Sequence, residues 1–151
     1  IAQECHVVNI VAPIDGNGSA RNSDVFSMRD HAHVDIIIQL GVTGAAATVT
    51  LEECDDFTPS NSTAIGFNIY KEETAGGDTL GSMVAVSASG VATATTDGIF
   101  YVISLDASEL SDGYPSVRIA ISDPGSATLM SAVAVLSGSR YCGDANSTQI
   151  A

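Results

Sequence analysis

His-Val-Asp-Ile-Ile-Ile-Gln-Leu, at residues 33–40, gives the clearest indication of fold in this chain. Every second residue from Val34 to Leu40 is apolar, and alternate side chains of a β-strand point to the same face. The other face has His33, Asp35 and Gln39, with Ile37 as an apolar residue among them. This alternation predicts a strand with one face in a core and the other toward solvent.

The same alternation recurs along most of the chain. It runs through residues 47–52, 65–70 and 117–122, and turns at Ser89-Gly90, Asp97-Gly98 and Asp123-Pro124-Gly125 separate other strand-like stretches. The turns at Gly90 and Gly98 are typical of tight hairpins. The final stretch, 128–137, is apolar on both faces, which predicts a central strand. We expect about nine strands, at residues 5–12, 34–40, 47–52, 65–70, 79–86, 91–96, 100–106, 117–122 and 128–137.

These patterns predict an all-β fold, an antiparallel β-sandwich of jelly-roll type with at most one short helical turn, at residues 107–110. The 151 residues are the usual size of one domain. Within it we expect an N-terminal strand and flexible arm over residues 1–24, the sandwich over 25–142 and a polar tail over 143–151.

The charge balance is strongly acidic. Lys and Arg total 5 against 18 Asp and Glu, which gives a net charge of -13, and Lys71 is the only lysine. Nucleic-acid binding depends on clustered Lys and Arg, so neither nucleic acid nor an anionic membrane is expected as a partner. Acidity keeps copies of a soluble chain apart, and it also suits a basic partner surface or divalent cations.

No apolar run reaches the length of a membrane span, so we expect a soluble chain. The sequence begins at Ile1 without an initiator Met, which leaves a removed leader, and with it a secreted origin, open.

His31-Ala32-His33-Val34-Asp35 is the candidate for a metal site. Its three potential ligands, His31, His33 and Asp35, occupy alternate positions and would share one face of a strand. A solvated polar face explains the same residues, and we favour that interpretation, so no metal or other cofactor is expected.

Two acidic stretches also suit structural roles. Residues 15–19 begin like a calcium loop, but Ala20 stands where the loop needs glycine and Phe26 where it needs a bidentate Glu, so we expect a glycine-rich turn. The second stretch follows a predicted strand without a partner motif for acid–base chemistry, and we interpret it as a charged strand end. It consists of Glu52, Glu53, Asp55 and Asp56.

Three cysteines, Cys5, Cys54 and Cys142, allow at most one intrachain disulfide, and the sequence does not choose a pair. Cys5 and Cys142 lie near the two ends, where an intersubunit disulfide would form in an oxidising compartment. Three unpaired thiols acting as small hydrophobes are the alternative.

Catalytic signatures are lacking in the sequence. It has no G-x-S-x-G elbow, no local Cys–His signature and no phosphate-binding loop. We therefore expect a binding protein rather than an enzyme, with no catalytic residues.

A set of strand and turn segments lies between residues 23 and 141. The segments are Ser27-Met28, 33–36 (HVDI), 44–52 (GAAATVTLE), 100–103 (FYVI), 105–110 (LDASEL), 117–119 (VRI) and 135–141 (VLSGSRY). In their arrangement the chain resembles the small head decoration, or cement, proteins of tailed bacteriophages. The three cysteines are not part of this pattern.

The resemblance implies a β-sandwich on the outer surface of an assembled icosahedral shell, at junctions between capsomers, where it strengthens the virion. The implied partners are the major capsid protein and further copies of the chain in a homotrimer. An extracellular adhesion or carbohydrate-binding β-sandwich, or a subunit of another surface assembly such as a tail or filament, is the alternative.

Overall fold

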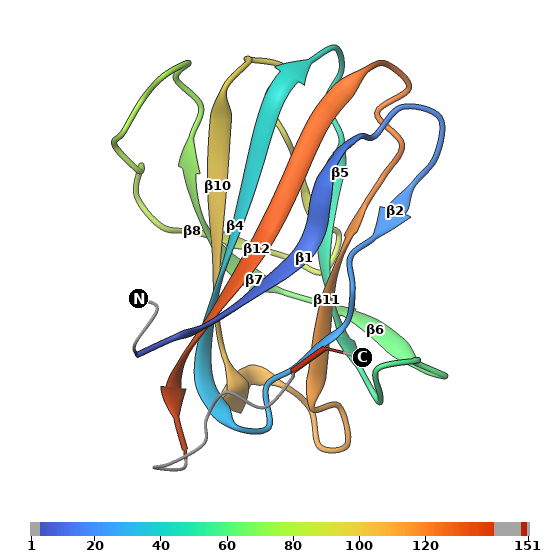
Figure 1. The fold of residues 1–151 in the computed structure, drawn as a ribbon, viewed down its shortest axis with the longest axis vertical. Helices are drawn as coiled ribbons and strands as arrows, with labels where there is room; N and C mark the ends of the chain where they lie inside the picture. The colour runs from blue at the N-terminus through green and yellow to red at the C-terminus, as the bar shows by residue number, and fades with distance from the viewer. Residues whose placement is uncertain (1–3, 141–148, 151) are drawn as a thin grey trace.

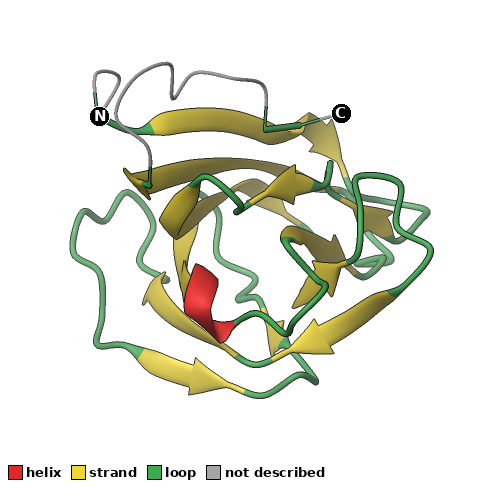
Figure 2. Cartoon of the chain, turned by 90° about the horizontal axis from the view of Figure 1, so that it is seen from below, coloured by secondary structure: helices red, strands yellow, loops and turns green. Residues whose placement is uncertain are grey.

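The computed structural model describes residues 4–140 and 149–150, which form two antiparallel β-sheets around a common core (Figure 1). The strands are β1 (His6–Asp15), β2 (Arg21–Asn22), β3 (Phe26–Ser27), β4 (His31–Thr43), β5 (Thr48–Cys54), β6 (Ser62–Ile65), β7 (Phe67–Glu72), β8 (Val84–Val86), β9 (Val91–Ala92), β10 (Ile99–Asp106), β11 (Ser116–Ile121) and β12 (Thr128–Ser139). One 3₁₀ turn, η1 (Ala107–Glu109), is the helical element in this part of the chain (Figure 2). No helix of the described residues has the length and hydropathy to cross a membrane.

The strand pairing is that of a jelly roll. Sheet A has the order β1-β12-β4-β10-β7-β8, and sheet B has the order β2-β11-β5-β6, with β3 also paired to β11 and β9 to β5. From the two ends inward, β1 pairs with β12, β2 with β11, β4 with β10 and β5 with β6. Such nested pairing wraps one long antiparallel ribbon into two facing sheets.

The core is built from the inward faces of both sheets. Along β4 the alternate residues from Val34 to Leu40 are at most 2% exposed, as the sequence pattern predicts. Leu51 of β5 and Ile119 of β11 are equally buried and lie opposite each other in sheet B. Each branched side chain removed from water in this way contributes about 1.5–3 kcal/mol, so the inward rows account for most of the stability of the sandwich.

The prediction of an all-β antiparallel sandwich is confirmed, as is a central position for the final strand, because β12 lies between β1 and β4. The predicted count of about nine strands is wrong, since residues 4–140 alone form twelve. Strands β2 and β3 have two residues each, too few to show alternation. Residues 62–72 form two strands in different sheets, separated at Gly66, where a Cβ would lie 3.0 Å from the Val86 carbonyl oxygen.

The prediction of tight hairpins at Gly90 and Gly98 is also wrong. Both glycines have positive φ and reverse the chain, but β8 and β10 belong to sheet A and β9 to sheet B. A Cβ on Gly90 would lie 2.4 Å from the Val49 carbonyl oxygen. Glycine therefore brings this turn close against β5, and the chain crosses between sheets instead of doubling back.

Of the expected N-terminal strand and flexible arm over residues 1–24, residues 6–15 form strand β1 of sheet A, and residues 21–22 form strand β2 of sheet B. Of the expected tail, Gln149 is buried and Ile150 forms a β-bridge with Phe26. Residues 143–148 and 151 lie outside the described part of the chain.

Candidate functional site

His33, on the outward side of β4, lies between two carboxylates. Its Nδ1 is 2.7 Å from Asp106 Oδ1, and its Nε2 is 3.2 Å from Asp35 Oδ1 and 3.3 Å from Ser104 Oγ. Burial acts to lower the pKa of His33, but the hydrogen bonds to Asp106 and Asp35 outweigh it and raise the pKa above the ordinary histidine value. The arrangement favours a protonated histidine that bridges the two carboxylates.

His31 does not join this group. It is buried, with its ring centroid 6.0 Å from that of His6, while the next residue, Ala32, is exposed, so strict alternation fails at the beginning of β4. Burial and the neighbouring His6 lower the pKa of His31. The structure thus brings His33 and Asp35 together without His31, and no three His, Cys, Asp or Glu side chains of the described residues are placed to hold a metal ion.

The glycine-rich turn after β1 is held by two carboxylates, Asp15 at the end of β1 and Asp123 in the turn that precedes β12. Asp15 Oδ1 accepts hydrogen bonds from the backbone N–H groups of Asn17 and Thr128, both at 3.0 Å, and these bonds lower the pKa of Asp15. Asp123 Oδ1 accepts from the Gly18 N–H at 3.2 Å. These hydrogen bonds hold the glycine-rich turn against β12 and against the turn at residues 123–125.

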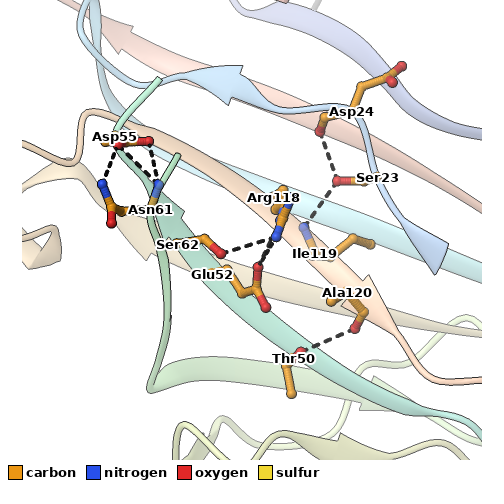
Figure 3. Close-up of polar contacts among 10 residues, drawn as sticks. All are labelled: Ser23, Asp24, Thr50, Glu52, Asp55, Asn61, Ser62, Arg118, Ile119 and Ala120. Carbon is orange, nitrogen blue, oxygen red and sulfur yellow. Dashed lines mark hydrogen bonds and ion pairs between the residues drawn. The ribbon is translucent and has the colours of Figure 1, made fainter. Parts of the chain in front are cut away.

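The acidic stretch at the end of β5 is likewise engaged inside the molecule. Buried Glu53 accepts a hydrogen bond from the Ser111 backbone N–H at 2.8 Å. Asp55 binds Asn61 through both backbone and side chain, and these bonds lower the pKa of Asp55 (Figure 3). Asp56 accepts from the backbone N–H of the residue that follows it. The cluster stabilises a strand end and a turn.

Two of the three cysteines are described, and both are free thiols. Cys54 is buried, and burial raises the pKa of its thiol above the ordinary value; Cys5 is partly exposed. No bridge joins these two. Cys142 lies outside the described residues.

The outer face of sheet A, which points away from the core, has an unusually apolar surface. One row crosses five strands at matched register, from Asn9 through Val133, Ile37 and Val102 to Tyr70. Further apolar side chains stand on either side of this row: Val7 and Val135 on one side, Phe100 and Leu129 on the other. Val7 and Leu129 are 51% and 48% exposed.

The outer face of sheet B is polar by contrast. Arg118 of β11 and Glu52 of β5 form an ion pair at 2.7 Å, and Arg118 also donates to Ser62 Oγ at 3.1 Å (Figure 3). Beside them, Thr50 Oγ1 donates to the Ala120 carbonyl oxygen at 3.3 Å. This face satisfies its polar groups internally and is suited to water.

A hollow of about 460 Å³ opens at one end of the outer face of sheet A. Gly41 leaves space beside Leu129, since a Cβ at this position would lie only 3.2 Å from the Leu129 Cβ. Ile14, which is 38% exposed, lines the same hollow together with Gln39 and Ser131. The opposite end of this face has the His33, Asp35 and Asp106 group.

The sequence contained part of this surface: Ile37 interrupts a polar row, and residues 128–137 are apolar on both faces. From the sequence alone, this pattern predicts a central strand and does not reveal a surface. The cross-strand register, which aligns Ile37 with Val133 and Val102, is what turns separate residues into a surface.

No family model matches this sequence, and no curated protein matches it either. Among solved structures, the chain is similar to one described as the structure of infectious bursal disease virus Gt strain, with 11% sequence identity and a TM-score of 0.22. The match covers 93% of this chain and 45% of the solved chain, so this chain spans less than half of it. A likeness at this level identifies neither a family nor a partner.

Proposed function

We propose that this chain is a structural decoration protein, which binds the outer surface of an assembled phage head at capsomer junctions and stabilises it. The observation that carries the proposal is the apolar outer face of sheet A on an already packed sandwich. Contiguous apolar surface of this kind marks protein–protein contact. Two further points support the proposal: the scaffold is a rigid all-β sandwich, and the segments between residues 23 and 141 resemble those of decoration proteins.

Stabilisation would come from preferential binding to the assembled state. A subunit that binds the shell but not free capsid protein shifts the equilibrium toward the shell. Many copies on one shell add their individual contributions. The role needs no turnover, so we propose a binding protein, not an enzyme, with the major capsid protein as its partner.

The charge of the chain suits this role. A net charge of -13 keeps unbound subunits soluble and apart, and with Lys71 as the only lysine it disfavours nucleic acid and anionic membranes. The location that follows is the outside of the virion, away from the packaged genome.

A homotrimer, which the resemblance implies, would use a second apolar surface. Leu80, Met83 and Val84 are 40%, 55% and 46% exposed along the edge strand β8 and the segment before it. Edge strands with exposed apolar side chains pair readily with another chain. This surface is separate from the row at Ile37.

Cosedimentation tests the proposal. The purified chain is mixed with shells assembled from the proposed partner, the major capsid protein, and separately with the same capsid protein in its unassembled form. Binding to shells alone is the expected result. Equal binding to both, or binding to neither, would contradict the proposal, and calcium-dependent binding on a glycan array would favour the adhesion alternative.

A further inference from the structure

From the outer face of sheet A we infer the chemistry of the partner: an apolar strip about 20 Å long with a large apolar side chain at one end and an arginine or lysine at the other. This inference rests on the proposed function, because the partner in question is the shell. The inference identifies the surface that docks on the shell, the orientation in which it docks, and the side chains that the shell must present to it.

The centre of the face supplies the apolar contact. Val133, Ile37 and Val102 lie side by side on β12, β4 and β10, and Tyr70 follows on β7. All four side chains are partly exposed, and their strands are held on both sides by neighbours. A partner that covers the row removes apolar surface from water without any rearrangement of the sheet, which keeps the entropic cost of binding low.

The hollow at Gly41 defines one end. Its volume of about 460 Å³ is sufficient for a large side chain, and Ile14 and Leu129 give it apolar walls. A leucine, methionine or phenylalanine of the partner fits this chemistry.

The acidic group defines the other end. The side chains of Asp35 and Asp106 are 45% and 61% exposed and bracket His33. Asp35 and Gly41 stand six residues apart on β4, which corresponds to about 20 Å of extended strand. The two ends therefore give the surface a direction.

The charges on this face distinguish two possible occupants, a second copy of the chain and a partner protein with a basic residue. The six strands of sheet A contain one lysine or arginine, Lys71, which lies opposite Tyr101 at an inward position. A second copy of the chain would therefore offer no lysine or arginine to Asp35 and Asp106 from this face, because its one outward cation, His33, is already paired with its own Asp35 and Asp106. The net charge of -13 on each copy would also oppose the approach. A partner with a basic residue meets the acidic end and repays its desolvation.

The test replaces two apolar residues at the centre of the row by threonine, which is β-branched and polar. In the double variant Ile37→Thr/Val102→Thr both positions keep β-branched side chains, so the sheet is retained while the surface becomes polar. The matched control is Thr50→Val, a swap of similar size on the outer face of sheet B. We expect shell binding to fall at least about tenfold in the double variant and to stay within about twofold in the control.

Three further measurements make the outcome decisive. Thermal melts confirm that each variant folds, and unchanged shell binding by a folded double variant would overturn the inference while the proposed function stands. No binding by the wild-type chain would remove the proposed function, and the inference with it. Sedimentation of the chain alone shows whether the double variant loses self-association, which would make a second copy the occupant and overturn the inference.

Hydroxyl-radical footprinting of the wild-type chain on shells does not depend on any variant. We expect protection of Tyr70, Phe100 and Leu129, which belong to the outer face of sheet A. Protection confined to Leu80 and Met83 would place the contact on the β8 edge and overturn the inference.

Discussion

The two outer faces of the sandwich differ although the two inward faces are alike. Sheets A and B bury the same kinds of branched side chains in one core, yet sheet B presents Arg118, Glu52 and Thr50 outward while sheet A presents Val133, Ile37 and Val102. Folding alone requires only the inward rows. The proposed docking to another molecule would account for the outward apolar row, and the polar outward face of sheet B is the reference for a face that contacts only solvent.

The largest expected effect is the difference in stability lost when each of two neighbouring residues of β4, Ile38 and Ile37, is replaced by alanine. Ile38 points into the core and is 1% exposed, whereas Ile37 points outward. Ile38→Ala should lower the free energy of unfolding by about 2–5 kcal/mol, because it leaves a cavity, and Ile37→Ala should lower it by less than about 1.5 kcal/mol. Urea titration of both variants measures this, and equal losses would mean that the two faces do not differ as described.

The next effect tests the polar face. Arg118→Met removes the cation beside Glu52, whose side chain is 21% exposed, and should lower the free energy of unfolding by about 1–2 kcal/mol. Shell binding should not change. The double variant Arg118→Met/Glu52→Gln should recover part of the loss in the same urea titration; a change in shell affinity with Arg118→Met would instead assign sheet B a part in docking.

A smaller effect should follow from neutralising the acidic end of sheet A. Asp35→Asn/Asp106→Asn should weaken shell binding by about three- to tenfold at low salt, and the difference should shrink as salt screens the contact. Affinity measured across a salt series provides the check. Tighter binding by the neutralised variant would show that this end faces an acidic surface.

The smallest effect concerns pH. Burial lowers the pKa of His33, but the hydrogen bonds to Asp106 and Asp35 outweigh it and raise this pKa above the ordinary histidine value of 6.5, so the folded state binds the proton more tightly than the unfolded chain. The stability contributed by this group is complete below about pH 6.5 and is lost as pH rises through the folded pKa. His33→Gln should therefore lower the melting temperature by a few degrees at pH 5.5 and by less at pH 8.5, and a larger drop at pH 8.5 would contradict the pairing.

Much of the fold follows from local patterns, and the remainder depends on which segments meet. Alternation along residues 34–40 predicts the inward row of β4, and the two apolar sides of residues 128–137 predict an interior strand. No local sequence pattern predicts that the chain passes from sheet B to sheet A at Gly66. A glycine within a strand pattern is equally consistent with a β-bulge and with a crossing between sheets. The short strands β2 and β3 depend on β11 for their hydrogen bonds.

The candidate site shows the same division. The sequence places His33 and Asp35 on one face of a strand, and the structure confirms their contact at 3.2 Å. Asp106 joins them because the register of β10 on β4 sets it opposite His33, and no spacing along the chain encodes that register. His31 is excluded because the alternation fails at the beginning of the strand, where packing against His6 buries its ring.

The nested pairing of the strands also orders events during synthesis. His6 of β1 lies opposite Leu136 of β12, so β1 leaves the ribosome long before the strand to which it forms hydrogen bonds has been made. Contacts so distant along the chain make folding slow. Because β12 also supplies Val133 and Leu129 to the outer face of sheet A, a nascent chain without β12 lacks the centre of the proposed docking surface and would not yet bind the proposed partner.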